Sequence, residues 1–265
     1  MGLIRRAAAA IRHGLAEPMT AGLALDDLDT TVHRADLIQS KRFVRRIYEE
    51  WYRLIAETLP PIEGPVVEIG SGGGFLRRAV PGVFCSDVLL VPTVHLVLDA
   101  AAGLPFTDAS LRAIVMTNAF HHIPDARRFL GDVVRCLKPG GVLAMIEPWV
   151  TPWSRFVYTN FHHEPFEPTS PSWELDPGRP LSAANGALPW IVFERDRQLF
   201  DRQFPALHIV SLDPLMPLRY LLSGGVSIRS AVPAWSFPFW RQVDELLLRT
   251  TSRSAMFARV VVRRN

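Results

Sequence analysis

Several features that would assign the chain to a broad protein class are scarce or missing. Its 265 residues include only two cysteines, Cys85 and Cys136, at a separation typical of neither a metal site nor a redox motif. Such sparse use of cysteine fits a reducing compartment, and we expect a cytoplasmic protein. No run approaches the ~18–20 consecutive apolar residues that span a bilayer. The N-terminus also lacks the apolar core and cleavage site of a secretory signal.

Basic residues only slightly outnumber acidic ones. The formal net charge is +3, and only Lys41 and Lys138 are lysines among the 29 basic residues. No basic block is interleaved with aromatic residues in the way that tracks nucleic acid, so we expect no nucleic-acid partner. Residues 1–20 do predict a short basic amphipathic helix. It is either a terminal helix of no further role or a site of weak membrane-surface contact.

What is present suffices for a large core, because 48% of the residues are hydrophobic. We expect four parts. Residues 1–40 form an N-terminal helical extension whose second half is irregular, and residues 41–148 form a core domain. Residues 149–206 form an insert on the substrate side, irregular up to residue 190 and rich in Pro, Trp, Phe and His. Residues 207–265 complete the sheet.

Short apolar strands alternate with helical periodicity, which predicts an α/β fold with a doubly wound, mostly parallel seven-stranded sheet. The expected strands are 66–69, 83–87, 95–99, 113–117, 142–146, 207–212 and 256–262. The expected helices are 41–59 with Ser40 as N-cap, a helix begun by Asp125 and ended by Pro139, and helices over 189–204 and 237–249.

The most informative segment is Val66–Gly74, whose sequence VVEIGSGGG describes a buried strand that ends on an acid and enters a glycine turn. Glycine allows positive φ and lets a ligand approach the backbone, as nucleotide-like ligands do at strand-to-helix turns. A dinucleotide fingerprint needs a small residue where Phe75 stands, which weakens an NAD interpretation. The carboxylate of Glu68 would repel a pyrophosphate but attract an ammonium group.

Together with later segments in the right order, this turn resembles the class I S-adenosylmethionine-dependent methyltransferases. The segments are an acid after the second strand, LDAAAGLPFTDASL, TNAFHHIPD and LKPGGVLAMIEP, and together with the turn they cover about a third of the chain. The resemblance implies a Rossmann-like fold and S-adenosyl-L-methionine as the cofactor.

The resemblance also implies roles for nine residues in cofactor binding. Backbone at Gly70, Ser71, Gly72 and Gly74 would pass close to the methionine part, and Glu68 would face its ammonium. Asp87 would accept hydrogen bonds from the ribose, Asp99 from the adenine amino group with Ala100 against the ring, and Asn118 would lie near the sulfonium. Ordinary strand-ending acids and a plain turn residue remain alternatives for Asp87, Asp99 and Asn118. Only 12 residues separate the two aspartates, so we expect a loop and a short third strand between them.

A methyl acceptor that is an alcohol or phenol needs a base, and histidine titrates in the useful range. The candidates are His121, His122 and His163, with loop packing as the alternative for the first two. Adjacent histidines do not easily ligate one ion, so we expect no metal. Asn118 is not followed by the Pro-Pro-aromatic run of base-flipping methylases, which disfavours a nucleic-acid substrate.

The sequence therefore predicts a methyltransferase of a small or medium-sized acceptor, acting at oxygen by in-line displacement. Aromatic residues of the insert would form an apolar lid or, equally, a secondary core. An inactive, cofactor-binding subunit that stabilises a partner or docks on a membrane is the alternative function.

Overall fold

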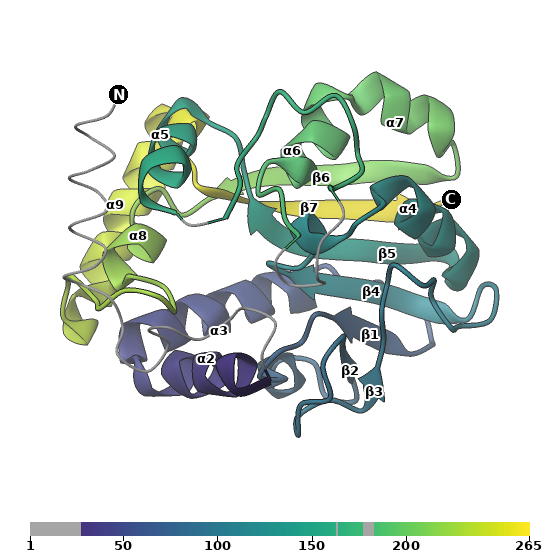
Figure 1. Ribbon diagram of the computed structural model, residues 1–265, viewed down its shortest axis with the longest axis horizontal. Coiled ribbons are helices and arrows are strands. Elements are labelled where there is room, and N and C mark those ends of the chain that lie inside the picture. Colours follow the sequence, from purple (N-terminus) through teal and green to yellow (C-terminus); the bar gives the residue numbers. More distant parts are fainter. Residues whose placement is uncertain (1–27, 163, 177–182) are drawn as a thin grey trace.

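The computed structural model describes residues 28–162, 164–176 and 183–265, which are built around one seven-stranded sheet (Figure 1). The strand order is β3-β2-β1-β4-β5-β7-β6. The strands are β1 (Val66–Ile69), β2 (Phe84–Asp87), β3 (Leu96–Val97), β4 (Leu111–Thr117), β5 (Leu137–Pro148), β6 (Leu207–Leu215) and β7 (Phe257–Arg264). The first five pair in parallel, and β7 runs antiparallel between β5 and β6. The expected doubly wound, mostly parallel sheet is confirmed.

Layers of helices cover the sheet, and this coverage explains the unbroken apolar runs of its central strands. All four residues of β1 are buried, as are Ala113–Met116 of β4. A strand buried on both faces has no reason to alternate apolar with polar residues. The helices are α2 (Leu28–Ser40), α3 (Arg42–Ala56), α4 (Ala126–Cys136), α5 (Pro152–Phe161), α6 (Leu188–Trp190), α7 (Arg197–Gln203), α8 (Arg219–Ser223) and α9 (Phe237–Thr250).

The strands and connections on the β2 and β3 side of the sheet are short. A 3₁₀ turn over Phe75–Arg78 is the only regular structure between β1 and β2 in this described segment, and a loop joins β2 to the two-residue β3. The expected connecting loop and short third strand are therefore present. This side of the sheet is held by turns and loops rather than by full crossover helices.

Two expectations about helices were wrong. The segment expected to be irregular before residue 40 contains α2, and Ser40 ends that helix instead of capping α3. The helix was missed because only Thr30, Leu37 and Ile38 of α2 are buried, which leaves a weak apolar period. Packing against α3 stabilises it instead.

The insert was also expected to be irregular up to residue 190, yet it contains α5. A reciprocal cap starts this helix: the Thr151 hydroxyl accepts from the Ser154 amide at 3.0 Å, and the Ser154 hydroxyl accepts from the Thr151 amide at 2.8 Å. Pro152 then occupies the first helical turn, where its missing N–H costs nothing. The cap at Asp125 was predicted correctly, since its carboxylate accepts from the Arg128 amide at 3.0 Å.

At the left of Figure 1, α5, α8 and α9 gather beyond one end of the sheet.

A buried arginine on α8 joins this group to α3. The Arg219 guanidinium donates to both carboxylate oxygens of Glu50, at 2.8 and 2.9 Å, and to Asp244 of α9 at 2.7 Å. Within the described ranges, every helix is too short or too polar to cross a bilayer.

Candidate functional site

A cavity of about 780 Å³ opens where β1, β2 and β4 end. Its volume lies within the range of small-molecule sites. The turn after β1 forms one wall and the segment after β4 another, while residues of α2, α3, α5 and α8 close it from the other side. Because parallel strands end at the same edge of the sheet, residues from separate motifs meet there.

The glycine turn after β1 is shaped for close approach. Gly70 and Gly72 have φ of +72° and +50°, which disfavours any side chain. A Cβ on Gly70 would lie 2.6 Å from the Cβ of Ala119, so this glycine lets the turn pack against the segment after β4. A Cβ on Gly72 would meet no atom within 4 Å, because that position faces the cavity.

Asp87, at the tip of β2, holds this turn in place. One of its carboxylate oxygens accepts from the Gly72 amide at 2.9 Å, and the other accepts from the Leu89 amide at 3.1 Å. Ser71 adds a second tie, because its hydroxyl accepts from the Ser86 amide at 3.1 Å. The Asp87 side chain also lines the cavity, so it faces a ligand while fixing the backbone around it.

Glu68 is a buried acid with one oxygen that has no partner among the described residues. Its Oε2 is buried and makes no hydrogen bond with the described residues. Burial raises the pKa of Glu68 to about 7, although hydrogen bonding from Ser71 and Cys85 works against that rise. A buried carboxylate oxygen without a partner is costly unless a cation or donor reaches it. The position therefore fits a ligand that brings an ammonium group into the cavity.

Of the remaining residues expected to bind cofactor, some line the cavity and one does not. Asp99, Ala100 and Asn118 line the cavity. Asp99 is exposed and accepts from the Ala101 amide at 2.8 Å, whereas Ala100 is buried. Asn118 has φ of +53°, a strained conformation of the kind found at binding sites. Gly74 does not line the cavity; a Cβ there would lie 3.0 Å from the Thr93 carbonyl oxygen, so its place is in the packing behind the turn.

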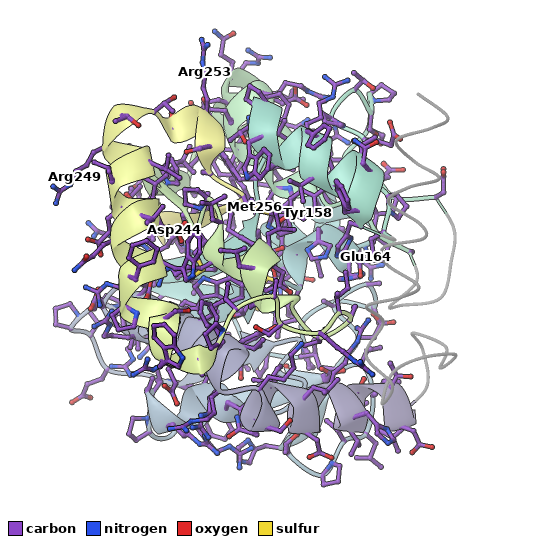
Figure 2. The ribbon with its side chains drawn as sticks, turned by 90° about the vertical axis from the view of Figure 1, so that its left-hand side faces the viewer. Tyr158, Glu164, Asp244, Arg249, Arg253 and Met256 are labelled. Carbon is purple, nitrogen blue, oxygen red and sulfur yellow. The ribbon has the colours of Figure 1, made fainter. Side chains whose placement is uncertain are left out.

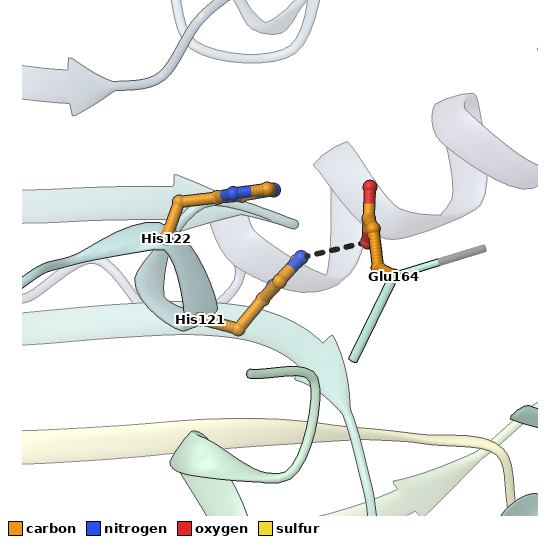
Figure 3. A group of neighbouring side chains, drawn as sticks. All are labelled: His121, His122 and Glu164. Atoms are coloured by element: carbon orange, nitrogen blue, oxygen red, sulfur yellow. Dashed lines mark ion pairs between the residues drawn. The ribbon is translucent and has the colours of Figure 1, made fainter. Parts of the chain in front are cut away.

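The two adjacent histidines after β4 differ sharply in environment. Nδ1 of His121 lies 2.6 Å from Oε2 of Glu147, and its Nε2 lies 3.6 Å from Oε2 of Glu164 (Figure 3). Glu147 is fully buried, and its other oxygen accepts from the amides of Ala119 and Phe120, both at 2.8 Å. Burial opposes the imidazolium, but the two carboxylates outweigh it and raise the pKa of His121 well above its usual value. His121 therefore carries a proton at neutral pH.

His122 is in the opposite state. Burial, together with the charge of His121, lowers the pKa of His122 to about 4. Its Nδ1 lies 3.2 Å from the Ala183 carbonyl oxygen, which only accepts, so Nδ1 carries the proton and Nε2 keeps a lone pair. His122 lines the cavity, and its ring is 4.2 Å from that of His121, centroid to centroid. The pair thus offers one charged donor and one neutral acceptor.

His121, His122 and Glu164 also form a group whose donor atoms lie within 4.8 Å of one another, close enough to converge on a cation. His121 already lies between two carboxylates. A proton on its ring accounts for that geometry without any added ion. His163, the third histidine expected in catalysis, lies outside the described residues.

Two tyrosines of the cavity wall, Tyr48 and Tyr220, went unnoticed in the sequence, whereas Tyr158 belongs to the insert aromatics already expected there. Tyr48 of α3, Tyr158 of α5 and Tyr220 of α8 all line the cavity, together with Arg34 of α2. Burial raises the pKa of all three phenols, so they stay neutral. Because Tyr48, Tyr158 and Tyr220 lie on three separate helices, no spacing in the sequence predicts that they meet.

The aromatic residues of the insert divide between the two roles expected for them. Tyr158 and Phe161 line the cavity. Trp173 is fully buried away from it, donating its indole N–H to Asp196 at 2.8 Å and lying under the Arg127 guanidinium. Phe156 remains 45% exposed. The insert therefore contributes both to the cavity and to a secondary core.

Known proteins match the central part of the chain. Residues 67–145 match the family described as "Methyltransferase domain". A 2-methyl-6-phytyl-1,4-hydroquinone methyltransferase from Synechocystis sp. is 29% identical over 147 residues, which is 49% of this chain and 45% of that protein. A demethylmenaquinone methyltransferase from Listeria monocytogenes is 28% identical over 43% of this chain and 48% of its own length.

A phthiotriol/phenolphthiotriol dimycocerosates methyltransferase from Mycobacterium tuberculosis is 43% identical over 90 residues, 28% of this chain and 33% of that protein. The chain thus spans less than half the length of these curated relatives. Among solved structures, geranyl diphosphate C-methyltransferase from Streptomyces coelicolor A3(2), crystallised with S-adenosyl-L-homocysteine, has a TM-score of 0.49. It is 13% identical, with 84% of this chain and 81% of that chain covered.

Proposed function

We propose that the chain, which resembles the class I S-adenosylmethionine-dependent methyltransferases, methylates an oxygen atom of an apolar small or medium-sized acceptor, with His122 as the base. One observation carries the proposal above all. The unpartnered oxygen of Glu68 and the open face of Gly72 lie in the same cavity as a neutral, lone-pair-bearing His122.

The described residues fit the cofactor of this family. Glu68 would hold the ammonium group, amides of the glycine turn would approach the methionine part, and Asp87 and Asp99 would accept from ribose and adenine. When bound, S-adenosyl-L-methionine supplies a methyl group on a sulfonium, which is electrophilic without help from the protein. The protein's task is to hold the acceptor atom in line and to remove its proton.

The two histidines would divide that task. His122, which is neutral, would accept the proton of an acceptor hydroxyl at Nε2. His121 holds its own proton between Glu147 and Glu164 and is a poor base, while burial, together with the charge of His121, keeps His122 unprotonated. Glu164 would orient the ring of His121.

An apolar acceptor is supported by the wall of the cavity and by the relatives. The cavity wall includes the apolar side chains of Val157, Phe161, Phe166 and Leu221. Two of the curated relatives are named for a 2-methyl-6-phytyl-1,4-hydroquinone and for demethylmenaquinone. A hydroxyl on such a ring would be a suitable acceptor for the base proposed here.

The test is to measure S-adenosyl-L-homocysteine binding by calorimetry and turnover on a panel of hydroquinones and phenols with alkyl chains. His122→Gln should leave the affinity for S-adenosyl-L-homocysteine unchanged and lower kcat by about 100-fold or more, the usual contribution of a general base. His121→Gln is the comparison, because it should alter the pH profile of kcat through the pKa of His122.

Equal activity of the His122→Gln variant would remove the base assignment. Tight binding without turnover on any acceptor would instead favour an inactive, cofactor-binding subunit. Failure to bind S-adenosyl-L-homocysteine at all would contradict the methyltransferase function itself.

A further inference from the structure

One surface of the protein exposes more apolar side chain than a water-facing helix needs. Trp235, Phe239 and Leu246 are 80%, 58% and 62% exposed. Trp235 is in the 3₁₀ turn that leads into α9, four residues before Phe239, and Leu246 follows seven residues later. Positions separated by four and seven residues lie on one side of a helix. We call these three residues the apolar stripe.

Basic side chains flank the apolar stripe at both ends. Arg229 is exposed before the stripe, and Arg249 and Arg253 are exposed after it. In Figure 2 the latter two extend outward from α9 and from the turn that follows it.

The two acids of this segment do not balance those charges. Asp244 is buried and bound to Arg219, and Glu245 pairs with Arg241 at 2.9 Å. The stripe is therefore apolar in the middle and positive at its ends.

The segment before the stripe in the chain lines the cavity. Leu221, in the middle of α8, is 36% exposed and also lines the cavity, as do Gly224 and Ile228 in the loop that follows. Lys41 fixes that loop by donating to the carbonyls of Gly225 and Ile228 at 2.8 and 2.5 Å. The chain then runs from this loop to Trp235, and α8 packs against α9, the helix that carries Phe239 and Leu246.

We propose that the apolar stripe, with Arg229, Arg249 and Arg253, docks on the surface of an anionic phospholipid bilayer. Tryptophan and phenylalanine suit the boundary between headgroups and acyl chains, while arginines at the same depth bind anionic headgroups. A protein partner could use the same side chains, but exposed apolar residues with positive charge at both ends match an anionic lipid surface better.

The inference stands apart from methyl transfer, because it concerns binding and its measurement needs no turnover. The full chain is mixed with large vesicles of phosphatidylglycerol and phosphatidylcholine, or of phosphatidylcholine alone, and the bound fraction is measured by flotation. We expect binding to the anionic vesicles that weakens at 0.5 M salt, since screening shortens the reach of the arginines.

Two variants separate the apolar and electrostatic contributions. The triple variant Trp235→Ala, Phe239→Ala, Leu246→Ala should lower vesicle affinity at least tenfold. The variant Arg249→Ala, Arg253→Ala should remove most of the preference for anionic lipid. Leu90→Ala is the matched control, because Leu90 is 74% exposed on the opposite, β2 side of the sheet and should change nothing. Unchanged binding of S-adenosyl-L-homocysteine by each variant shows that it is folded.

The proposal fails if the triple variant binds anionic vesicles as well as the unaltered chain; residues 1–20 would then be the contact. It also fails if the unaltered chain ignores vesicles but forms dimers that the triple variant loses, because the stripe would then bind a second copy. Loss of vesicle binding with cofactor binding intact supports docking and leaves the proposed function to its own test.

Discussion

At the scale of single residues, Glu68 is the group whose charge the binding of cofactor would change most. Its pKa is raised by burial to about 7, so at pH 6 the acid is mostly protonated and at pH 8 mostly charged. An ammonium group stabilises only the charged form. We therefore expect the affinity for S-adenosyl-L-homocysteine to rise with pH, by about tenfold between pH 6 and 8 at most.

The check is calorimetry across that range, beside Glu68→Gln, which should bind weakly and with no such slope. His122 does not confuse the measurement, because a pKa of about 4 leaves it neutral throughout. A glutamine variant with the slope intact would show that another group carries the pH dependence and that Glu68 does not face the ammonium.

Residue chemistry was the part of the site that the sequence predicted most directly. An acid before a glycine turn and an acid at the next strand's end are local patterns, and the structure brings Glu68, Gly72 and Asp87 to one cavity. The difference between His121 and His122 was not predictable, since it depends on carboxylates 26 and 43 residues further along the chain. Identical neighbours in sequence have opposite protonation because their surroundings are not local.

At the scale of elements, the strand–turn unit of β1 is open to a matched test. Gly72→Val should abolish binding of S-adenosyl-L-homocysteine, because the new side chain would project into the cavity. The same change also strains a residue with φ of +50°, at a cost of about 1–2 kcal/mol. Gly82→Val separates the two effects: Gly82 has φ of +79° with open space around its Cβ and does not line the cavity.

Both variants should therefore lose similar stability in urea unfolding, while only Gly72→Val loses the ligand. Equal loss of affinity in the two would mean that backbone strain, rather than a blocked cavity, governs binding. Normal affinity in Gly72→Val would show that the ligand does not approach the turn at that point.

Elements with a strong period or a buried run were predicted well, and those without were not. Apolar runs predict the central strands. Apolar residues at helical spacing and the cap at Asp125 predict α4. The helix α2 is held by packing on α3, which no local pattern reports. The helix α5 did carry a signal, Thr151 followed by Pro152 and Ser154, but the abundance of proline and aromatic residues around it obscured that signal.

At the scale of the whole molecule, the cavity depends on elements far apart in sequence staying together. Its walls come from α2 and α3 near one end of the described chain and from α8 near the other. Arg219 joins them through Glu50, 169 residues away, and through Asp244. Such a pairing cannot be read from sequence, where an arginine on a short apolar helix resembles any exposed charge.

Arg219→Ala should therefore destabilise the fold far more than the loss of an ordinary ion pair. Removing the guanidinium leaves the buried carboxylate of Asp244 without its partner, which costs about 3–5 kcal/mol. Arg45→Ala is the control: it breaks the exposed pair with Glu49 within α3 and should cost less than about 1 kcal/mol. Urea unfolding measures both.

The penalty for Arg219→Ala should also be smaller at pH 5 than at pH 8, because burial already raises the pKa of Asp244 and a protonated Asp244 would bury no charge. A penalty that stays constant with pH would show that lost packing of the arginine, and not the orphaned acid, holds these helices against α3.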